Sequence, residues 1–147
     1  MLKGISPIIS PQLLEIMARM GHGDEILLAD AHYPCETFNS RVVRADGLRV
    51  PELLEAMLEL LVLDEYVEHP LIMMAAVNND VLDPEVEASF LKAIRKSHPE
   101  VKGVLHIDKP AFYERSKSAF AIVATGETCK YGNIILKKGV TPLPEKK

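Results

Sequence analysis

With 147 residues, the chain has the length of one domain and can bury roughly 70% of the surface that its unfolded form exposes. Its 21 acidic and 17 basic residues are interspersed and give a net charge of −4, which argues against a nucleic-acid-binding protein. No stretch approaches the ~20 apolar residues of a membrane span, and two cysteines without metal-ligand spacing favour a reduced, cytoplasmic protein.

The first predicted element is a helix whose boundaries are marked by three residues. Ser10 is suited to the N-cap, Pro11 to the first helical position and Gly21 to the position just past the end. The spacing of its apolar residues places four of them on one face, namely Leu13, Leu14, Met17 and Met20. This amphipathic helix leads the chain directly into His22.

A short buried strand is predicted over 26–29, where four apolar residues follow one another. Titratable residues flank it on both sides, with His22 before it and Asp30 and His32 after it. Ligands bind at the carboxyl ends of the strands in open α/β sheets, and Asp30 falls at such an end. Asp30 is therefore a candidate binding residue, and a plain turn carboxylate is the alternative that these residues leave open.

Helices and strands alternate along the rest of the chain. The uninterrupted apolar run over 71–77 is typical of a strand buried on both faces of a parallel sheet. An irregular loop is expected over 32–39 and a turn over 45–47. The predicted helices cover 51–61, 84–97 and 110–118, and the predicted strands cover 41–44, 71–77, 101–107, 119–124 and 134–136.

This alternation predicts an α/β fold, a three-layer α/β/α domain with a mainly parallel sheet. The last two strands are too close in sequence for a helical crossover, so at least one strand should pair antiparallel. A single domain is expected over 1–140, followed by a loosely ordered tail over 141–147 that is rich in proline and charge.

Several common catalytic motifs are missing from the sequence. It contains no GxxxxGK[ST] phosphate loop, no GxGxxG fingerprint after a strand and no GxSxG elbow. Four residues around the first strand, His22, Asp24, Asp30 and His32, are potential metal ligands. They lack the i, i+4 spacing of helical zinc sites, so no metal and no cofactor is predicted.

What remains is histidine and carboxylate chemistry together with hydrogen-bonding groups suited to a polyol. A histidine exchanges protons near neutral pH, and Asp30 is a candidate acceptor for sugar hydroxyls or an orienting partner. Lys109 and Tyr113 are candidate donors, although a solvated lysine and a tyrosine at the edge of the core remain open. In Tyr131-Gly132-Asn133, the glycine allows close backbone approach between two hydrogen-bonding side chains, and an ordinary turn is the alternative.

Short segments spread over almost the whole chain resemble, in order, the fucose branch of the RbsD/FucU family. They are Ile5-Ser6-Pro7, Met20-Gly21-His22-Gly23-Asp24-Glu25, Ala29-Asp30-Ala31-His32, Arg44-Ala45-Asp46-Gly47, Met73-Met74-Ala75-Ala76-Val77, Phe112-Tyr113-Glu114-Arg115 and the run 130–140. The ribose branch shares the Gly-His-x-Asp, Asp-Ala and Tyr-x-Asn-Ile elements. The segments 73–77 and 112–115 favour fucose.

The resemblance implies roles for individual residues. His22 is similar to the catalytic proton donor of the family, Asp30 to a ligand of the substrate, and Tyr113 and Tyr131-Gly132-Asn133 to further sugar contacts. Lys109 stands where an arginine is expected, so its charge is kept and the planar two-pronged donor is lost. His32 and His106 have weaker claims to a role.

The activity implied by the resemblance is sugar mutarotation, the interconversion of the α and β anomers of L-fucose. It requires only proton transfers that open and close the ring, so acid–base assistance of ~10²–10⁴-fold and positioning are sufficient. Two alternatives stay open. One is a ribose-type pyranase that interconverts pyranose and furanose forms, and the other is a sugar-binding module without catalysis.

The positions of His22 and Asp30 in the chain constrain this site. An extended chain rises ~3.3 Å per residue, so the two residues lie up to ~25 Å apart if the predicted strand separates them. Either the segment folds back, or His22 acts on a sugar bound by a neighbouring subunit. The resemblance implies a ring-shaped homo-oligomer, a decamer, and we therefore expect sites between subunits.

Overall fold

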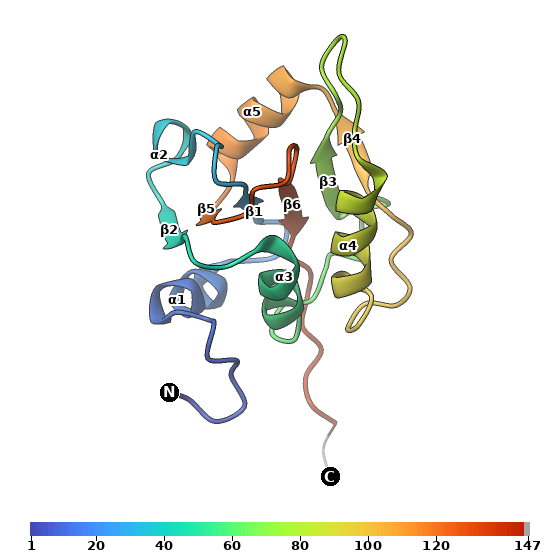
Figure 1. Ribbon diagram of the computed structural model, residues 1–147. Coiled ribbons are helices and arrows are strands. Elements are labelled where there is room, and N and C mark those ends of the chain that lie inside the picture. The colour runs from blue at the N-terminus through green and yellow to red at the C-terminus, as the bar shows by residue number, and fades with distance from the viewer. Residues whose placement is uncertain (146–147) are drawn as a thin grey trace.

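A six-stranded sheet in the order β2-β5-β1-β6-β3-β4 is the central layer of the computed structural model, which describes residues 1–145 (Figure 1). The strands are β1 (Glu25–Ala29), β2 (Val42–Ala45), β3 (Leu71–Met74), β4 (Leu105–Ile107), β5 (Ala121–Thr125) and β6 (Ile134–Lys137). The helices are α1 (Pro11–Arg19), α2 (Cys35–Phe38), α3 (Val50–Leu58), α4 (Pro84–Ile94) and α5 (Lys109–Ser118).

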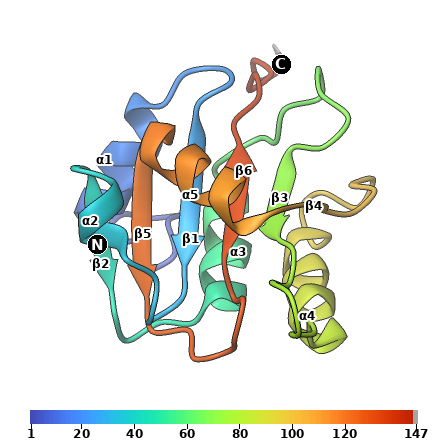
Figure 2. The same ribbon diagram turned by 90° about the horizontal axis from the view of Figure 1, so that it is seen from above.

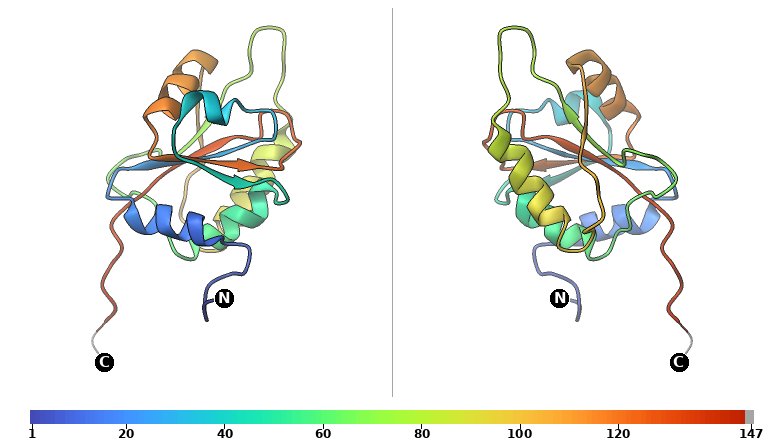
Figure 3. Two further views of the ribbon diagram at one scale, coloured as in Figure 1. Left: turned by 90° about the vertical axis from the view of Figure 1, so that its left-hand side faces the viewer. Right: turned by 90° about the vertical axis from the view of Figure 1, so that its right-hand side faces the viewer.

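Helices cover both faces of this sheet, which confirms the predicted α/β/α arrangement. In Figure 3 the sheet is seen nearly edge-on, with α2 and α5 on one side and α1, α3 and α4 on the other. Side chains of β1 alternate between the two cores: Ile26 and Leu28 pack with the larger cluster, and Leu27 and Ala29 with the smaller one. The central strand is therefore buried on both faces, as the apolar run 26–29 predicts.

The sheet is mostly parallel, and β6 is the antiparallel strand. It runs between β1 and β3 and pairs antiparallel with both, whereas the pairs β1–β5, β2–β5 and β3–β4 are parallel. The expected antiparallel strand is thus confirmed. Its neighbours are β1 and β3 rather than β5, so the link 126–133 must carry the chain past the end of β1.

Two strands are shorter than the apolar runs that predict them. β3 ends at Met74, after which Ala75 still donates a backbone hydrogen bond to Ile107 at 2.8 Å and the chain then turns away, leaving Val77 40% exposed. β4 begins only at Leu105, because this strand lies at the edge of the sheet and pairs with β3 alone. The residues released from β3 form a loop beside the carboxyl edge of the sheet.

The helices also differ from expectation at their ends. Ser10 caps α1 by accepting a hydrogen bond from the Leu13 N–H at 3.1 Å, as predicted, whereas α3 and α4 end three residues before the predicted limits of 61 and 97. The predicted loop 32–39 was wrong over part of its length, because Cys35–Phe38 forms the one-turn helix α2. The Phe38 ring packs there against Tyr113, with ring centroids 4.7 Å apart.

Beyond Val140 the described residues 141–145 are exposed and belong to no helix or strand, and the last two residues of the predicted tail lie outside the described part. In Figure 1 this segment leaves the domain on the side of α1 and α3. Within residues 1–145, every helix is too short or too polar to cross a membrane.

Candidate functional site

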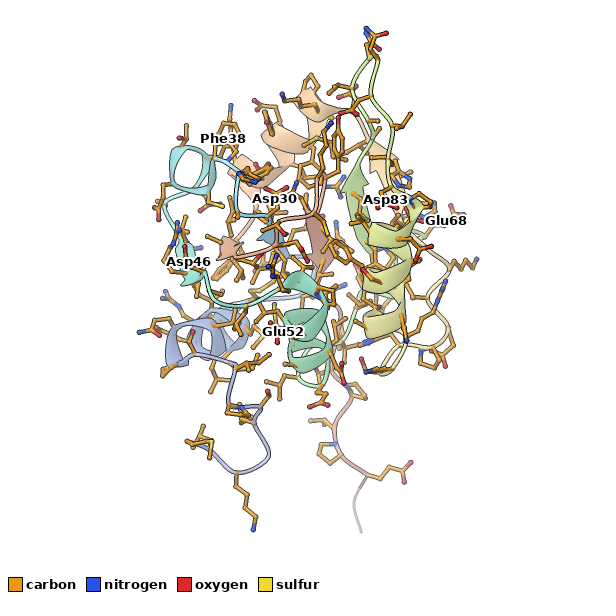
Figure 4. All side chains as sticks on the ribbon, in the orientation of Figure 1. Asp30, Phe38, Asp46, Glu52, Glu68 and Asp83 are labelled. Atoms are coloured by element: carbon orange, nitrogen blue, oxygen red, sulfur yellow. The ribbon has the colours of Figure 1, made fainter. Side chains whose placement is uncertain are left out.

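A cavity of about 230 Å³ lies at the carboxyl edge of the sheet, where β1 ends and β6 begins. Five residues predicted from the sequence line it: Asp30, Lys109, Tyr113, Tyr131 and Asn133. His32, Tyr33, Pro34, Met74, Val77 and Lys130 complete the wall. Pockets for drug-sized ligands measure roughly 300–1,000 Å³, so this volume suits a smaller molecule. We call it the Asp30 cavity; Figure 4 labels Asp30.

Asp30 is held in place by Asn133, which immediately precedes the neighbouring strand β6. The backbone N–H of Asp30 donates to Asn133 Oδ1 at 2.7 Å, and Asn133 Nδ2 donates back to Asp30 Oδ2 at 3.0 Å. The other carboxylate oxygen, Oδ1, accepts from the His32 backbone N–H at 2.9 Å. Oδ1 therefore makes the short-range bond expected of a turn carboxylate. Oδ2 is instead bound by Asn133, a second residue of the cavity wall.

Asp30 is only 7% exposed, and this burial decides its protonation behaviour. Burial raises the pKa of Asp30 above its ordinary value, because desolvation outweighs the hydrogen bonds from His32 and Asn133. A partly dehydrated carboxylate is a stronger hydrogen-bond acceptor for a hydroxyl group than one in water. Asp30 is therefore suited to recognise a neutral polyol.

Lys109 and Tyr113 reach the cavity from the first turns of α5. Asp108 caps this helix by accepting from the Ala111 N–H at 2.9 Å, which fixes where the helix begins. Lys109 and Tyr113 are four residues apart and so share one face, and the ammonium lies 5.4 Å from the centroid of the Tyr113 ring. The structure thus brings both side chains to the cavity that Asp30 lines.

The link between β5 and β6 brings Tyr131 and Asn133 to the cavity. Tyr131 has a positive φ of 59°, and Gly132 lies between the two lining residues. A Cβ atom on Gly132 would come within 2.8 Å of the Cys129 carbonyl oxygen and 2.9 Å of Glu127 Cγ. The glycine at this position is therefore required by close packing of the link, and its side-chain-free backbone sets the positions of its two neighbours.

Replacing Asn133 by alanine is expected to lower the free energy of unfolding by about 2–3 kcal/mol, because it leaves the buried Asp30 N–H and carboxylate without a partner. Urea unfolding of both proteins at one fixed concentration measures the difference. Asn78→Ala is the matched control, since Asn78 is exposed, and it should change the value by less than about 0.5 kcal/mol. Equal losses in the two variants would contradict the role of Asn133.

His22 lies at the opposite edge of the sheet, in the turn that precedes β1. Asp24 stabilises this turn by accepting from the Gly21 N–H at 2.7 Å, and Gly23 has a positive φ of 86°. The His22 side chain is 46% exposed, its Nε2 lies 3.0 Å from Asp64 Oδ1, and its ring centroid lies 5.2 Å from that of Tyr66. His22 is therefore oriented by a carboxylate and remains open to solvent on its other side.

Asp64 is a candidate functional residue that the sequence did not reveal. Its side chain is 3% exposed, and its Oδ1 accepts from the Tyr66 N–H at 3.0 Å as well as facing His22. Burial opposes ionisation, but these two hydrogen bonds outweigh it and keep the pKa of Asp64 below its ordinary value. An ionised carboxylate beside an exposed imidazole is an arrangement that orients the ring and supports proton transfer.

The strand β1 separates the His22–Asp64 pair from the Asp30 cavity. Its five residues span on the order of 15 Å, and the segment does not fold back. Figure 2 shows the link between β5 and β6 at one end of β1 and the tail after β6 at the other. The structure therefore brings Asp30, Lys109, Tyr113, Tyr131 and Asn133 together and leaves His22 apart from them within one chain.

The remaining candidates are His32, His106 and Asp24. His32 lines the Asp30 cavity, with an exposed side chain, while His106 lies in a separate cavity of about 190 Å³ and pairs with Glu87 at 2.7 Å. Within residues 1–145, no three His, Cys, Asp or Glu side chains converge as metal ligands would. Asp24, considered above as a ligand, instead closes the turn that carries His22.

Known proteins share this chain's sequence and fold over nearly their full length. A model of the RbsD/FucU transport protein family matches residues 3–141. L-fucose mutarotases of Histophilus somni (strain 2336) and Actinobacillus pleuropneumoniae serotype 5b (strain L20) are 55% and 54% identical over 143 residues, covering 97% of this chain and 99% of each relative. The crystal structure of the fucose mutarotase from Streptococcus pneumoniae in complex with L-fucose is 45% identical, with a TM-score of 0.91 over 96% of this chain and 100% of that one.

Proposed function

The chain belongs to the RbsD/FucU family, and we propose that it interconverts the α and β anomers of L-fucose by acid–base catalysis. The observation that carries the proposal is the likeness, over 96% of the chain, to a fucose mutarotase solved with L-fucose. The Asp30 cavity supports it, since its size, its buried carboxylate and amide groups and its exposed lysine ammonium suit a monosaccharide.

Mutarotation breaks and reforms a single bond of the sugar ring. A base takes the proton of the anomeric hydroxyl while an acid protonates the ring oxygen, and the bond between that oxygen and the anomeric carbon breaks. The resulting aldehyde turns its other face, and the reverse proton transfers close the ring as the other anomer. No electrons leave the sugar, so the reaction needs general acid–base groups and positioning alone.

We assign the acid–base role to His22 and the orientation of its ring to Asp64. Asp30, Lys109 and Asn133 supply the hydrogen bonds that fix the sugar, with Tyr113 and Tyr131 forming the walls beside them. Lys109 donates from a flexible ammonium, whereas an arginine would present two parallel N–H groups. Lys109 therefore fixes the position of one hydroxyl and does not bind two oxygens in a common plane.

The distance between His22 and the Asp30 cavity within one chain implies an oligomer. We propose a ring-shaped decamer in which His22 of one subunit approaches the sugar held in the Asp30 cavity of the next. The support is that β1 separates His22 from the Asp30 cavity within one chain, while the His22 side chain is half exposed. The cytoplasm is the proposed compartment, consistent with both cysteines being free among the described residues.

The test is saturation-transfer NMR on L-fucose and on D-ribose with catalytic amounts of the protein. We expect faster transfer of saturation between the α- and β-pyranose signals of L-fucose than in buffer alone. Acceleration confined to pyranose–furanose exchange of ribose would favour the pyranase alternative. Binding of L-fucose without any acceleration would leave a sugar-binding module and overturn the proposed activity.

A further inference from the structure

The loop between β3 and α4 carries a carboxylate, Asp80, that joins the loop to the wall of the Asp30 cavity. Its Oδ2 accepts from the Tyr131 hydroxyl at 2.8 Å and lies 2.8 Å from the Lys130 ammonium. Its Oδ1 accepts from the Val81 N–H at 2.9 Å. Figure 3 shows this loop rising from the sheet on the same side as α2 and α5. One side chain thus links two segments that are distant in the sequence, the β3–α4 loop and the link between β5 and β6.

Tyr131 is the residue that this link holds. Its backbone has a φ of 59°, a left-handed conformation that is strained for a bulky side chain, so its position must be imposed by its contacts. The hydroxyl donates to Asp80 and accepts from the Val77 N–H at 3.2 Å. Its single proton is therefore engaged, and the ring, rather than the hydroxyl, is what Tyr131 presents to the Asp30 cavity.

Room exists for the Tyr131 ring to leave this position. Tyr131 and Lys130 border both the Asp30 cavity of about 230 Å³ and the second cavity of about 190 Å³, which also contains Leu82, Val86 and His106. Without the bond to Asp80, the ring is free to turn toward the second cavity, and Val77 loses its partner as well. The shape of the Asp30 cavity therefore depends on Asp80.

We propose that Asp80 is a positioning residue for the sugar: it fixes the Tyr131 ring and Val77 as walls of the Asp30 cavity, so that Tyr131 contacts L-fucose through its ring and not as a hydroxyl donor. This inference rests on the proposed function for the identity of the sugar. It assigns a role to a loop residue that is not among those lining the Asp30 cavity.

Asp80 thus acts as a clamp on the Tyr131 hydroxyl, and its oxygen that accepts this bond belongs to an ionised carboxylate under ordinary conditions. The bonds from the Lys130 ammonium and the Tyr131 hydroxyl lower the pKa of Asp80 to about 2. The carboxylate is thus ionised throughout the neutral range, and the clamp holds without help from the ligand.

The test compares Asp80→Ala and Tyr131→Phe with the double variant, using the exchange kinetics and the calorimetric affinity for L-fucose. We expect each single variant to raise KM and the dissociation constant by about tenfold while kcat changes less than about twofold, as for a lost binding contact. Because Asp80 acts through the Tyr131 hydroxyl, the double variant should be no weaker than either single one. Additive losses would overturn the proposal.

Two further variants separate positioning from a general effect on folding. Asp80→Asn keeps an oxygen that accepts from Tyr131 and should restore an affinity within about threefold of the unaltered protein. Asp46→Ala removes another exposed carboxylate, paired with Arg44 at 2.6 Å and remote from the cavity, and should leave the affinity unchanged. Failure of the asparagine rescue would contradict the clamp, even if Asp80→Ala unfolds.

The affinity for L-fucose measured by calorimetry tests the role of Asp80 separately from the proposed mutarotase activity. If the unaltered protein binds L-fucose without exchanging its anomers, the activity is refuted and the clamp is still tested by affinity. If exchange is present and Asp80→Ala binds normally, the clamp is refuted and the activity stands. An unaltered protein that does not bind L-fucose refutes both.

Discussion

His22→Ala is expected to slow the α/β exchange of L-fucose by about 10²–10⁴-fold, the range that general acid–base catalysis contributes. The imidazole is the group that can both give and take the proton in this reaction, and Asp64 at 3.0 Å holds its ring in one orientation. Binding of L-fucose should persist, because the Asp30 cavity is built without His22. Saturation-transfer NMR measures the exchange, and calorimetry measures the affinity.

The control for this variant is His69→Ala, which removes a histidine that lies 3.9 Å from Glu68 and does not line the Asp30 cavity. It should leave exchange unchanged. The fold of His22→Ala should also persist, because the altered side chain is 46% exposed and the turn beneath it is closed by Asp24. Exchange at the unaltered rate in a folded His22→Ala protein would remove His22 from the mechanism.

The local signals in the sequence were sufficient for most of the fold. The start of α1 follows from Ser10 and Pro11, and the position of β1 follows from the length of its apolar run, since both depend on neighbouring residues only. Asp30 was identified because the end of a strand in such a sheet is a place for ligands, and the structure indeed places it in a cavity.

The roles of residues with partners distant in the sequence could not be predicted from the sequence. Asp64 faces a histidine 42 positions away and is buried because Leu63 pairs with Lys138 from the far end of the chain. Asp80 meets Tyr131 across 51 positions, in a loop whose first residues, 75–77, the apolar run 71–77 assigned to a strand. No periodicity or cap encodes such contacts, because they arise only when β3 and β6 become neighbours.

Mixing two inactive proteins should restore activity if the sites are shared between subunits. His22→Ala lacks the acid–base group and Asp30→Ala lacks the sugar ligand, so neither forms a working site alone. After joint unfolding and refolding at equal amounts, a site works where an intact His22 meets an intact Asp30 of the neighbour, which occurs in about a quarter of the sites of a symmetric ring. The exchange rate should therefore rise from near background to roughly a quarter of the unaltered rate.

The control mixture combines His22→Ala with Asp64→Asn. His22 and Asp64 lie 3.0 Å apart within one chain. Half of the sites in that mixture therefore lack the imidazole and the other half have a misoriented one, so activity should be about half that of Asp64→Asn alone. Size-exclusion chromatography verifies that each variant and each mixture assembles like the unaltered protein. If mixing His22→Ala with Asp30→Ala restores nothing in intact oligomers, one subunit must supply both residues, and the half-exposed His22 would have to reach its sugar by moving across the length of β1.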